Sequence, residues 1–332
     1  MATITEVAKL ADVSIATVSN VIRGTRTVSP ELGDRVRAAI KKLNYSPNEL
    51  ARSLKLRQTR MLAVVIPDIT NPFFPETIRG AEDAALERGY FLLTANTNEE
   101  VHREKRIIEA LRAYRVDGIL LAPTSGTDIR HLQQARRAGV PIVCVDRSVP
   151  GLGADAVLLD NVGGARECVL HLIRKGHRRI ATVTGPLSVQ TGGERFQGYE
   201  QALREEGIPI KRNLIVEGNF HFASGYEAAK RLMTMKQRPT AIFSSNGVMA
   251  LGLLSWLEEA GMTCPGDVEL ATFSHLTAEA SSQPPMTTVV QPSYEIGTQA
   301  ATVLIDRIEG RLPQKRVVVR VSPTLVIRDP AH

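Results

Sequence analysis

The sequence predicts a small all-α head followed by an α/β core of two doubly wound lobes. Three observations lead to this fold class. The first sixty residues carry only helical patterns, and from Met61 onward apolar strand-like runs alternate with amphipathic stretches. The chain has 332 residues, more than one ordinary domain needs. The net charge of +6 lies wholly in the first sixty residues, where 11 Lys and Arg outnumber 5 Asp and Glu.

This uneven charge bears on the partners of the protein. A basic head on a neutral body is typical of a nucleic-acid-binding module joined to another function, although a solvated basic surface would give the same count. No apolar run approaches the roughly 18 residues that cross a bilayer. The opening residues MATITEVAKL lack the layout of a signal peptide. We therefore expect a cytoplasmic protein with no membrane partner.

Two short helical patterns open the head, over residues 4–11 and after Ser14. Thr3 or Thr5 can cap the first helix and Ser14 the second, and three or four residues separate them. This spacing predicts a helix-turn-helix. Side chains near the exposed start of the second helix would meet base edges in the major groove. They are Ile15, Ala16, Thr17, Ser19 and Asn20.

A third helix is expected from Ser29-Pro30 to about Leu43. The stretch after it, SPNELARSLKLRQTR, begins with an N-cap residue and a proline followed by good helix formers. Nine or ten residues are too few for an isolated helix to be stable in water. This segment therefore needs a partner in order to fold.

The body is expected to form parallel sheets. Its apolar runs resemble strands that are buried on both faces, and the stretches between them resemble crossover helices. Among these helices are residues 75–88, 103–114 and 129–138. The predicted strands are MLAVVIP, YFLLTAN, DGILLAP, PIVCVD, AVLLDN, RIATVTG, LIVEGN, TAIFSSN and VELATFS.

Two runs in the head, TITEVAKLADVSIATVSNVIRG and VSPELGDRVRAAIKKLNYSPNELARSLK, resemble the lactose-repressor/galactose-repressor family of bacterial transcription regulators. Within that family they are most similar to the purine-repressor branch. The body is similar to the family's periplasmic-binding-protein-like core, so the resemblance covers essentially the whole chain. It implies an effector-controlled DNA-binding repressor that is no enzyme and binds a palindromic operator as a homodimer.

The resemblance also implies how the head reads DNA. In the family, the segment matching residues 47–56 is a hinge helix that folds when two copies meet over DNA, and the leucine matching Leu54 enters the minor groove. Such a wedge kinks the duplex, and its folding can be coupled to binding. Base readout would fall to Ile15, Ala16 and Asn20. The implied DNA-binding set is Ser14, Ile15, Ala16, Thr17, Ser19, Asn20, Tyr45, Ala51, Arg52, Leu54 and Lys55.

The family's domain plan implies three crossings between the lobes, near residues 160–161, 291–292 and 322–323. We expect the head over 1–46 and the hinge helix and linker over 47–60. The N-terminal lobe would be 61–160 with 292–322, and the C-terminal lobe 161–291 with 323–332.

An effector cleft between the lobes follows from the same resemblance, at the carboxyl ends of the strands. Phe73 and Phe74 could instead pack a helix start, and Arg147 could form a surface ion pair. The implied effector-binding set is Asn71, Phe73, Phe74, Asp146, Arg147, Gln190, Thr191, Arg195, Phe220, Asn246 and Ser274.

Two positions depart from the family pattern. Members that bind neutral sugars usually carry Asp where this chain has Gly247 and Ser274. Without those carboxylates, Arg147 and Arg195 favour an anion, so we expect a sugar acid, a sugar phosphate or another small carboxylate.

Other classes of site find little support. GLGADA, residues 151–156, matches a dinucleotide fingerprint but precedes a strand, so we interpret it as a loop. His171 and His177 have no carboxylate or cysteine at ligand spacing, and Cys144, Cys168 and Cys264 form no CxxC motif, so no cofactor or metal is expected.

The quaternary structure and one alternative function stay open. The candidate dimer surface is the apolar helix over 248–257, which includes Leu251, Leu254 and Trp256, although core packing explains these residues equally well. The alternative function is a cytoplasmic small-molecule-binding protein whose basic head contacts RNA or a protein partner.

Overall fold

The computed structural model describes residues 2–23, 28–45, 58–124, 128–274 and 286–328. The chain divides into two compact units, Met1–Thr59 and Arg60–His332, here called the head and the core. The predicted hinge helix lies outside the described residues, as do four predicted DNA-binding residues. These are Ala51, Arg52, Leu54 and Lys55.

The head consists of helices α1 (Ile4–Ala11), α2 (Ile15–Arg23) and α3 (Pro30–Lys42). Thr3 caps α1 in a reciprocal capping box with Glu6, so of the two candidates the structure selects Thr3. Ser14 caps α2, because its Oγ accepts a hydrogen bond from the Thr17 backbone N–H at 3.1 Å. Six buried side chains form the centre of this unit. They are Val7, Ala8, Ala11, Val18, Val36 and Ala39.

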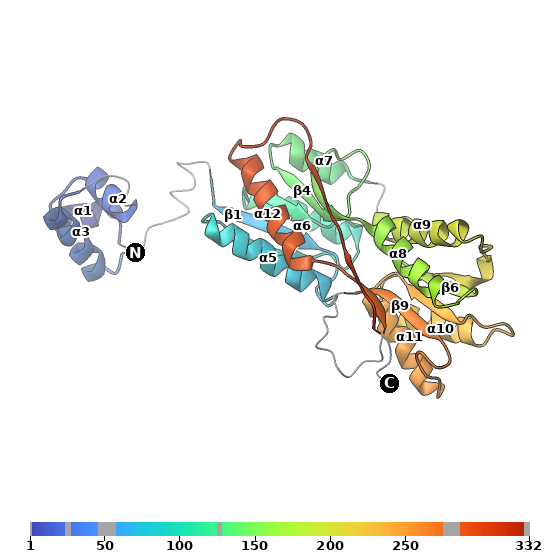
Figure 1. Cartoon of the computed structure of the whole chain (residues 1–332). Coiled ribbons are helices and arrows are strands. Elements are labelled where there is room, and N and C mark those ends of the chain that lie inside the picture. Colours follow the sequence, from blue (N-terminus) through green and yellow to red (C-terminus); the bar gives the residue numbers. More distant parts are fainter. Residues whose placement is uncertain (1, 24–27, 46–57, 125–127, 275–285, 329–332) are drawn as a thin grey trace. The chain divides into compact units, whose positions relative to one another are not determined.

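The first lobe of the core, the N-terminal lobe, is built on a six-stranded parallel sheet of order β11-β5-β4-β3-β1-β2. Helices α5 (Phe73–Glu87) and α12 (Ser293–Ile308) pack side by side on one face, as Figure 1 shows, and α6 (Val101–Ala113) and α7 (Arg130–Arg137) pack together on the other. The strands are β1 (Met61–Ile66), β2 (Phe91–Asn96), β3 (Gly118–Leu121), β4 (Ile142–Asp146), β5 (Asp155–Leu159) and β11 (Val318–Val321).

The C-terminal lobe has the sheet order β12-β10-β9-β8-β6-β7, in which only β12 is antiparallel to its neighbour. Helices α8 (Asn161–Arg174) and α9 (Gln190–Glu205) cover one face, and α10 (Phe222–Met233) and α11 (Gly247–Glu259) cover the other. The strands are β6 (Ile180–Thr184), β7 (Ile215–Glu217), β8 (Ala241–Ser244), β9 (Glu269–Ser274), β10 (Thr287–Val290) and β12 (Thr324–Val326), and the 3-10 turn η1 (Arg212–Leu214) precedes β7.

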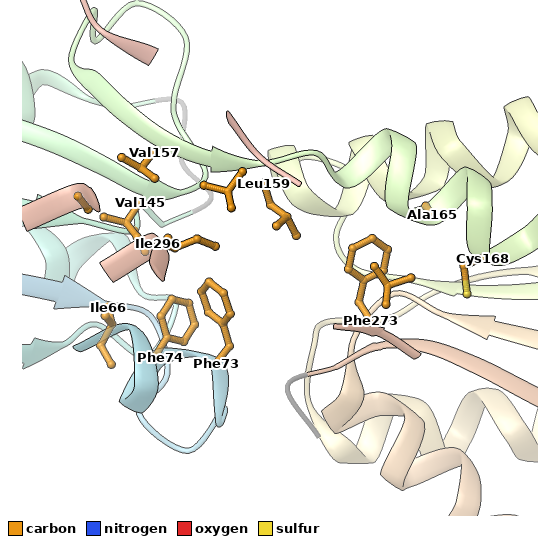
Figure 2. Packing of buried hydrophobic residues seen from close by; sticks show 14 of the residues in the cluster. Ile66, Phe73, Phe74, Val145, Val157, Leu159, Ala165, Cys168, Phe273 and Ile296 are labelled. Atoms are coloured by element: carbon orange, nitrogen blue, oxygen red, sulfur yellow. The ribbon is translucent and has the colours of Figure 1, made fainter. Parts of the chain in front are cut away.

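The chain passes between the two sheets after β5, after β10 and after β11. One apolar cluster continues through these crossings, from Val145 and Leu159 in the N-terminal lobe to Ala165, Cys168 and Phe273 in the C-terminal lobe (Figure 2). The lobes therefore share part of their core at the hinge.

The structure corrects some details of the pattern. Helix α5 begins at Phe73, two residues before the predicted start, and a proline in its first turn is tolerated there. Strand β2 is not buried on both faces, since it is an edge strand on which Phe91 is 67% exposed. The short strands β10, β11 and β12 were not predicted. No helix within the described residues is long and apolar enough to span a membrane.

Candidate functional site

The start of α2 forms the exposed face of the helix-turn-helix. Val18 is fully buried, whereas Ile15 is 48% exposed and Ser14 and Ala16 also lie at the surface. Thr17, Ser19 and Asn20 are partly exposed beside them. The predicted exposure of this helix start is therefore confirmed, and the contact of these side chains with DNA stays a prediction.

The rest of the head holds this face in place. The Arg35 guanidinium of α3 donates to the Asp12 backbone carbonyl at 3.0 Å and to its carboxylate at 3.1 Å, which ties α3 to the turn after α1. Tyr45, a predicted DNA contact, is half-buried and packs against the core of the head. Lys41 and Lys42 are exposed at the end of α3.

A second site lies in the core, where the carboxyl ends of both sheets border one cavity. Nine of the eleven predicted effector residues line it. They are Asn71, Phe73, Phe74, Asp146, Arg147, Thr191, Arg195, Phe220 and Asn246.

Phe73 and Phe74 begin α5 and form part of the wall on the side of the N-terminal lobe. Their rings meet edge to face with centroids 5.0 Å apart, and the two residues are only 4% and 3% exposed (Figure 2). They pack the start of the helix, and they also line the cavity. Packing at the helix start is thus confirmed, and contact of these rings with an effector stays a prediction.

Arg147 is a buried residue and forms no surface ion pair. It is 4% exposed, and its Nη2 donates to Glu99 Oε1 at 2.6 Å. Asp146 lies beside it, with 3.8 Å between Asp146 Oδ2 and Arg147 Nε. Burial raises the pKa of Asp146, and the charges of Arg147 and Arg195 oppose that shift.

Arg195 lies on the side of the C-terminal lobe, where it joins three segments of the chain. Its Nε donates to Asn161 Oδ1 at 2.8 Å, its Nη1 to the Ser245 carbonyl at 2.7 Å and its Nη2 to Gln291 Oε1 at 3.0 Å. Its guanidinium also lies 4.2 Å from the centroid of the Phe273 ring. Burial lowers the pKa of Arg195 to about 10. The two side chains that accept hydrogen bonds from Arg195 among the described residues, Asn161 and Gln291, are uncharged.

Asn246 shapes the same wall as the N-cap of α11. Its Oδ1 accepts from the Met249 backbone N–H at 2.9 Å, and its Nδ2 donates to the Phe220 carbonyl at 3.0 Å. The first two residues of α11, Gly247 and Val248, line the cavity. Backbone N–H groups in the first turn of a helix have no partner within the helix, so this wall can donate to a ligand.

Two predicted effector residues are placed differently. Gln190 begins α9 and accepts hydrogen bonds from the backbone N–H and hydroxyl of Ser148 at 2.6 and 3.0 Å, so it bridges the lobes beside the cavity. Ser274 ends β9 next to Val290 of β10, and its side chain lies outside the described set.

Sequence reasoning missed several residues of the cavity. Most of them follow the carboxyl end of a strand, and this position is the signal that could have identified them. The additional polar residues are Asp68, Glu99, His221 and Gln291, and the additional apolar side chains include Leu251 and Phe273.

The described part of the chain bears on the other classes of site at three kinds of position: possible metal ligands, the loop before β5 and the cysteines. It contains no cluster of three metal-ligating side chains. His177 meets a carboxylate from a distant part of the chain, because its Nε2 lies 2.9 Å from Oε2 of Glu269, 92 residues away. The predicted loop at Gly151 and Gly153 precedes β5, and both glycines have positive φ angles. Cys144 and Cys168 are buried thiols, and Cys264 is a half-buried one.

Comparison with known proteins agrees with this architecture. Residues 3–48 match the model of the bacterial regulatory proteins of the lacI family, and residues 169–329 match a periplasmic binding protein-like domain. The ribose operon repressor of Escherichia coli (strain K12) is 38% identical over 332 residues, which cover 100% of both chains. The HTH-type transcriptional repressor PurR of Vibrio atlanticus (strain LGP32) is 37% identical over 99% of this chain and 98% of its own.

Solved structures show the same arrangement of elements. A transcriptional regulator CelR-cellobiose complex has a TM-score of 0.74 at 34% identity and covers 99% of both chains. A lac repressor dimer bound to operator and the anti-inducer ONPF has a TM-score of 0.85 at 25% identity and covers 98% of both chains.

Proposed function

The chain belongs to the lacI family of bacterial regulatory proteins, and on this premise we propose that it represses transcription by binding a palindromic operator as a homodimer. The observation that carries the proposal is the exposed start of α2 on a basic head. One head reads only half a site, so a two-fold symmetric dimer fits an operator with two half-sites.

The operator part of the proposal is tested by gel shift. We expect a palindromic site selected from random DNA to bind at least a hundredfold more tightly than its scrambled sequence, with an affinity that falls steeply with salt. Asn20→Ala should lose most of this preference, and Leu54→Ala should lose affinity together with DNA bending. Equal binding of palindromic and scrambled DNA would instead favour a head that contacts RNA or a protein.

We propose that a small molecule in the cleft controls this binding, and that it carries an anionic group as well as hydroxyls, as a sugar acid or sugar phosphate does. Two features of the C-terminal wall support the anionic group. Arg195 is buried without a bonded carboxylate, and the first turn of α11 borders the same cavity at Gly247. The similarity to a ribose operon repressor supports a ligand derived from a sugar.

Isothermal titration with D-gluconate, D-ribose 5-phosphate, D-glucose and D-ribose tests the ligand class. We expect the acids to bind at least tenfold more tightly than the neutral sugars and to change operator affinity. Arg195→Gln should remove this preference, since it deletes the buried charge. Tight binding of a neutral sugar alone would contradict the anionic group and leave the repressor function standing.

The dimer is the remaining part of the proposal. Leu254 and Trp256 of α11 pack against the core of the C-terminal lobe, and Leu251 lines the cavity, so this helix gives no separate support for an interface. Sedimentation velocity of the full chain should give twice the mass of one chain, and a monomer at micromolar concentration would contradict it.

A further inference from the structure

Glu99 lines the cleft and was not among the residues that the family resemblance implied, although it follows the carboxyl end of β2. It lies in the turn between β2 and α6, where Asn98 and Glu99 have φ angles of 53° and 57°. Residues other than glycine avoid this left-handed region and adopt it where surrounding contacts enforce it. In this conformation the Glu99 carboxylate reaches Arg147, 48 residues away in sequence.

The ion pair of Glu99 and Arg147 leaves polar atoms unused. Oε1 of Glu99 accepts from Nη2 of Arg147, while Oε2 of Glu99 is buried without a hydrogen-bond partner in the described chain. Nε and Nη1 of Arg147 are likewise buried without a hydrogen-bond partner there, and Asp146 Oδ2 lies 3.8 Å from Nε. Buried donors and acceptors are costly when unpaired. Both side chains line the cavity, so a ligand group could satisfy an acceptor and two donors at once.

The charges around this pair restrict the kind of group. Glu99 and Asp146 lie on either side of Arg147, so two carboxylates surround one guanidinium. Glu99 already balances the charge of Arg147, so an anionic group gains little attraction at this end of the cavity, and an amine, which only donates, would leave the donors of Arg147 without an acceptor. Neighbouring hydroxyls remain, because each hydroxyl can both donate and accept.

We propose that Glu99 and Arg147 form a subsite for a vicinal diol, in which Glu99 Oε2 accepts from one hydroxyl and Arg147 donates to the adjacent one. This subsite rests on the proposed function of the cleft. It sets the orientation of the ligand, with its hydroxyl end toward the N-terminal lobe and its acidic end toward Arg195. Glu99 thereby supplies a carboxylate that positions 247 and 274 lack.

Calorimetry with matched probes tests the subsite. The ligands are D-gluconate with its monodeoxy analogues, and D-ribose with 2-deoxy-D-ribose. The proteins are the wild type, Glu99→Gln and the control Glu100→Gln, which removes the neighbouring carboxylate that bonds Asn98 and Arg103 outside the cavity. Thermal unfolding of each variant establishes that it is folded.

In the wild type, removing either hydroxyl of one adjacent pair should weaken binding about ten- to a hundredfold, as expected for a hydrogen bond to a charged group. In Glu99→Gln the parent ligand should bind about as weakly as its deoxy analogue, so the discrimination falls below about threefold. Glu100→Gln should discriminate as the wild type does.

Two results would overturn the subsite alone. If Glu99→Gln weakens parent and deoxy ligands by the same factor, Glu99 acts only by positioning Arg147. If Glu99→Gln binds every probe as the wild type does, Glu99 contributes nothing. If no hydroxylated probe binds the wild type, the subsite and the proposed ligand class fail together, while operator binding by the head is unaffected.

Discussion

In the N-terminal lobe the strands run in the order β2-β1-β3-β4-β5, and in the C-terminal lobe β7-β6-β8-β9-β10 repeats that order. Both sheets therefore present the carboxyl ends of equivalent strands to one cleft. The lobes differ in the charges found there. The N-terminal wall holds Glu99 and Asp146 around Arg147, whereas the C-terminal wall holds Arg195 bonded to uncharged acceptors.

This difference shows that sheet topology determines the position of the two cavity walls. The loops that follow the strands determine which charged and polar groups each wall carries. A symmetric scaffold can bind an asymmetric ligand when one wall accepts hydroxyl protons and the other donates to an acid. The two lobes can be tested against each other with paired substitutions.

The largest expected difference is between Arg147→Leu and Arg195→Leu. Loss of Arg147 leaves two buried carboxylates without their neighbouring positive charge. It should lower the free energy of unfolding by about 3 to 5 kcal/mol at pH 7. Loss of Arg195 leaves uncharged acceptors unpaired and should cost about 1 to 3 kcal/mol. Urea unfolding gives both values.

The pH dependence sharpens this pair of variants. The pKa of Asp146 is raised by burial, and Arg147 is the strongest opposing charge, so its removal raises that pKa further. A carboxyl group whose pKa is higher in the folded than in the unfolded protein destabilises the fold once it loses its proton. The deficit of Arg147→Leu should therefore be small near pH 4 and grow as pH rises through the folded pKa. A deficit independent of pH would contradict the unequal walls.

The next largest effects on stability are expected at two buried carboxylates far from the cleft, Asp155 at the start of β5 and Glu269 at the start of β9. Arg307 donates to both oxygens of Asp155, at 2.7 and 2.8 Å, so Arg307→Met should cost about 3 kcal/mol. Lys175→Met should cost about 1 kcal/mol, since His177 still contacts Glu269.

Urea midpoints compare these two variants. The matched control is Arg204→Met, which removes an exposed pair with Glu200 and should leave the midpoint unchanged. Equal losses for Arg307→Met and Lys175→Met would show that the two lobes hold their buried carboxylates equally strongly.

The helix pairs should respond alike in both lobes. A Cβ on Gly80 would lie 2.1 Å from the Tyr294 carbonyl oxygen between α5 and α12, and one on Gly225 would lie 2.0 Å from the Met249 carbonyl oxygen between α10 and α11. Gly80→Ala and Gly225→Ala should each cost about 1 to 3 kcal/mol through overpacking. Thermal unfolding measures the loss. If either variant is as stable as the wild type, its two helices can move apart without cost.

The smallest effect is expected at Glu269. Burial raises its pKa, but hydrogen bonds from Lys175 and His177 outweigh burial and hold the pKa below its usual range. A depressed carboxyl pKa stabilises the fold above the unfolded value and loses that contribution as pH falls through the folded one. Wild type and Glu269→Gln should thus differ slightly at pH 7 and converge in acid unfolding as pH falls below the lowered pKa of Glu269. A constant difference would contradict this assignment.

Much of the fold was predictable because its signals are local. The capped start of α2 at Ser14 and the apolar runs of β1, β3 and β4 follow from neighbouring residues alone. The exposure of β2 was not predictable, since a strand at the edge of a sheet can have the same composition as a central one.

The candidate site was predictable in part. Nine residues that line the cavity were found by resemblance, but the partners of the charged side chains among them were not. Arg147 was expected to attract an anion or to pair at the surface, and it pairs instead with Glu99 in the cavity wall. His177 likewise meets Glu269, a partner 92 residues away that no spacing rule would find.

By itself, the sequence determined the basic three-helix head, the alternation of strands and helices and the family, because each depends on periodicity or motifs within a few tens of residues. Only the tertiary structure decided which charges meet. Glu99 reaches Arg147 across two strand ends, and Arg195 reaches Gln291 across 96 residues. Those distances depend on sheet order and loop conformation, which bring together residues that the chain keeps far apart.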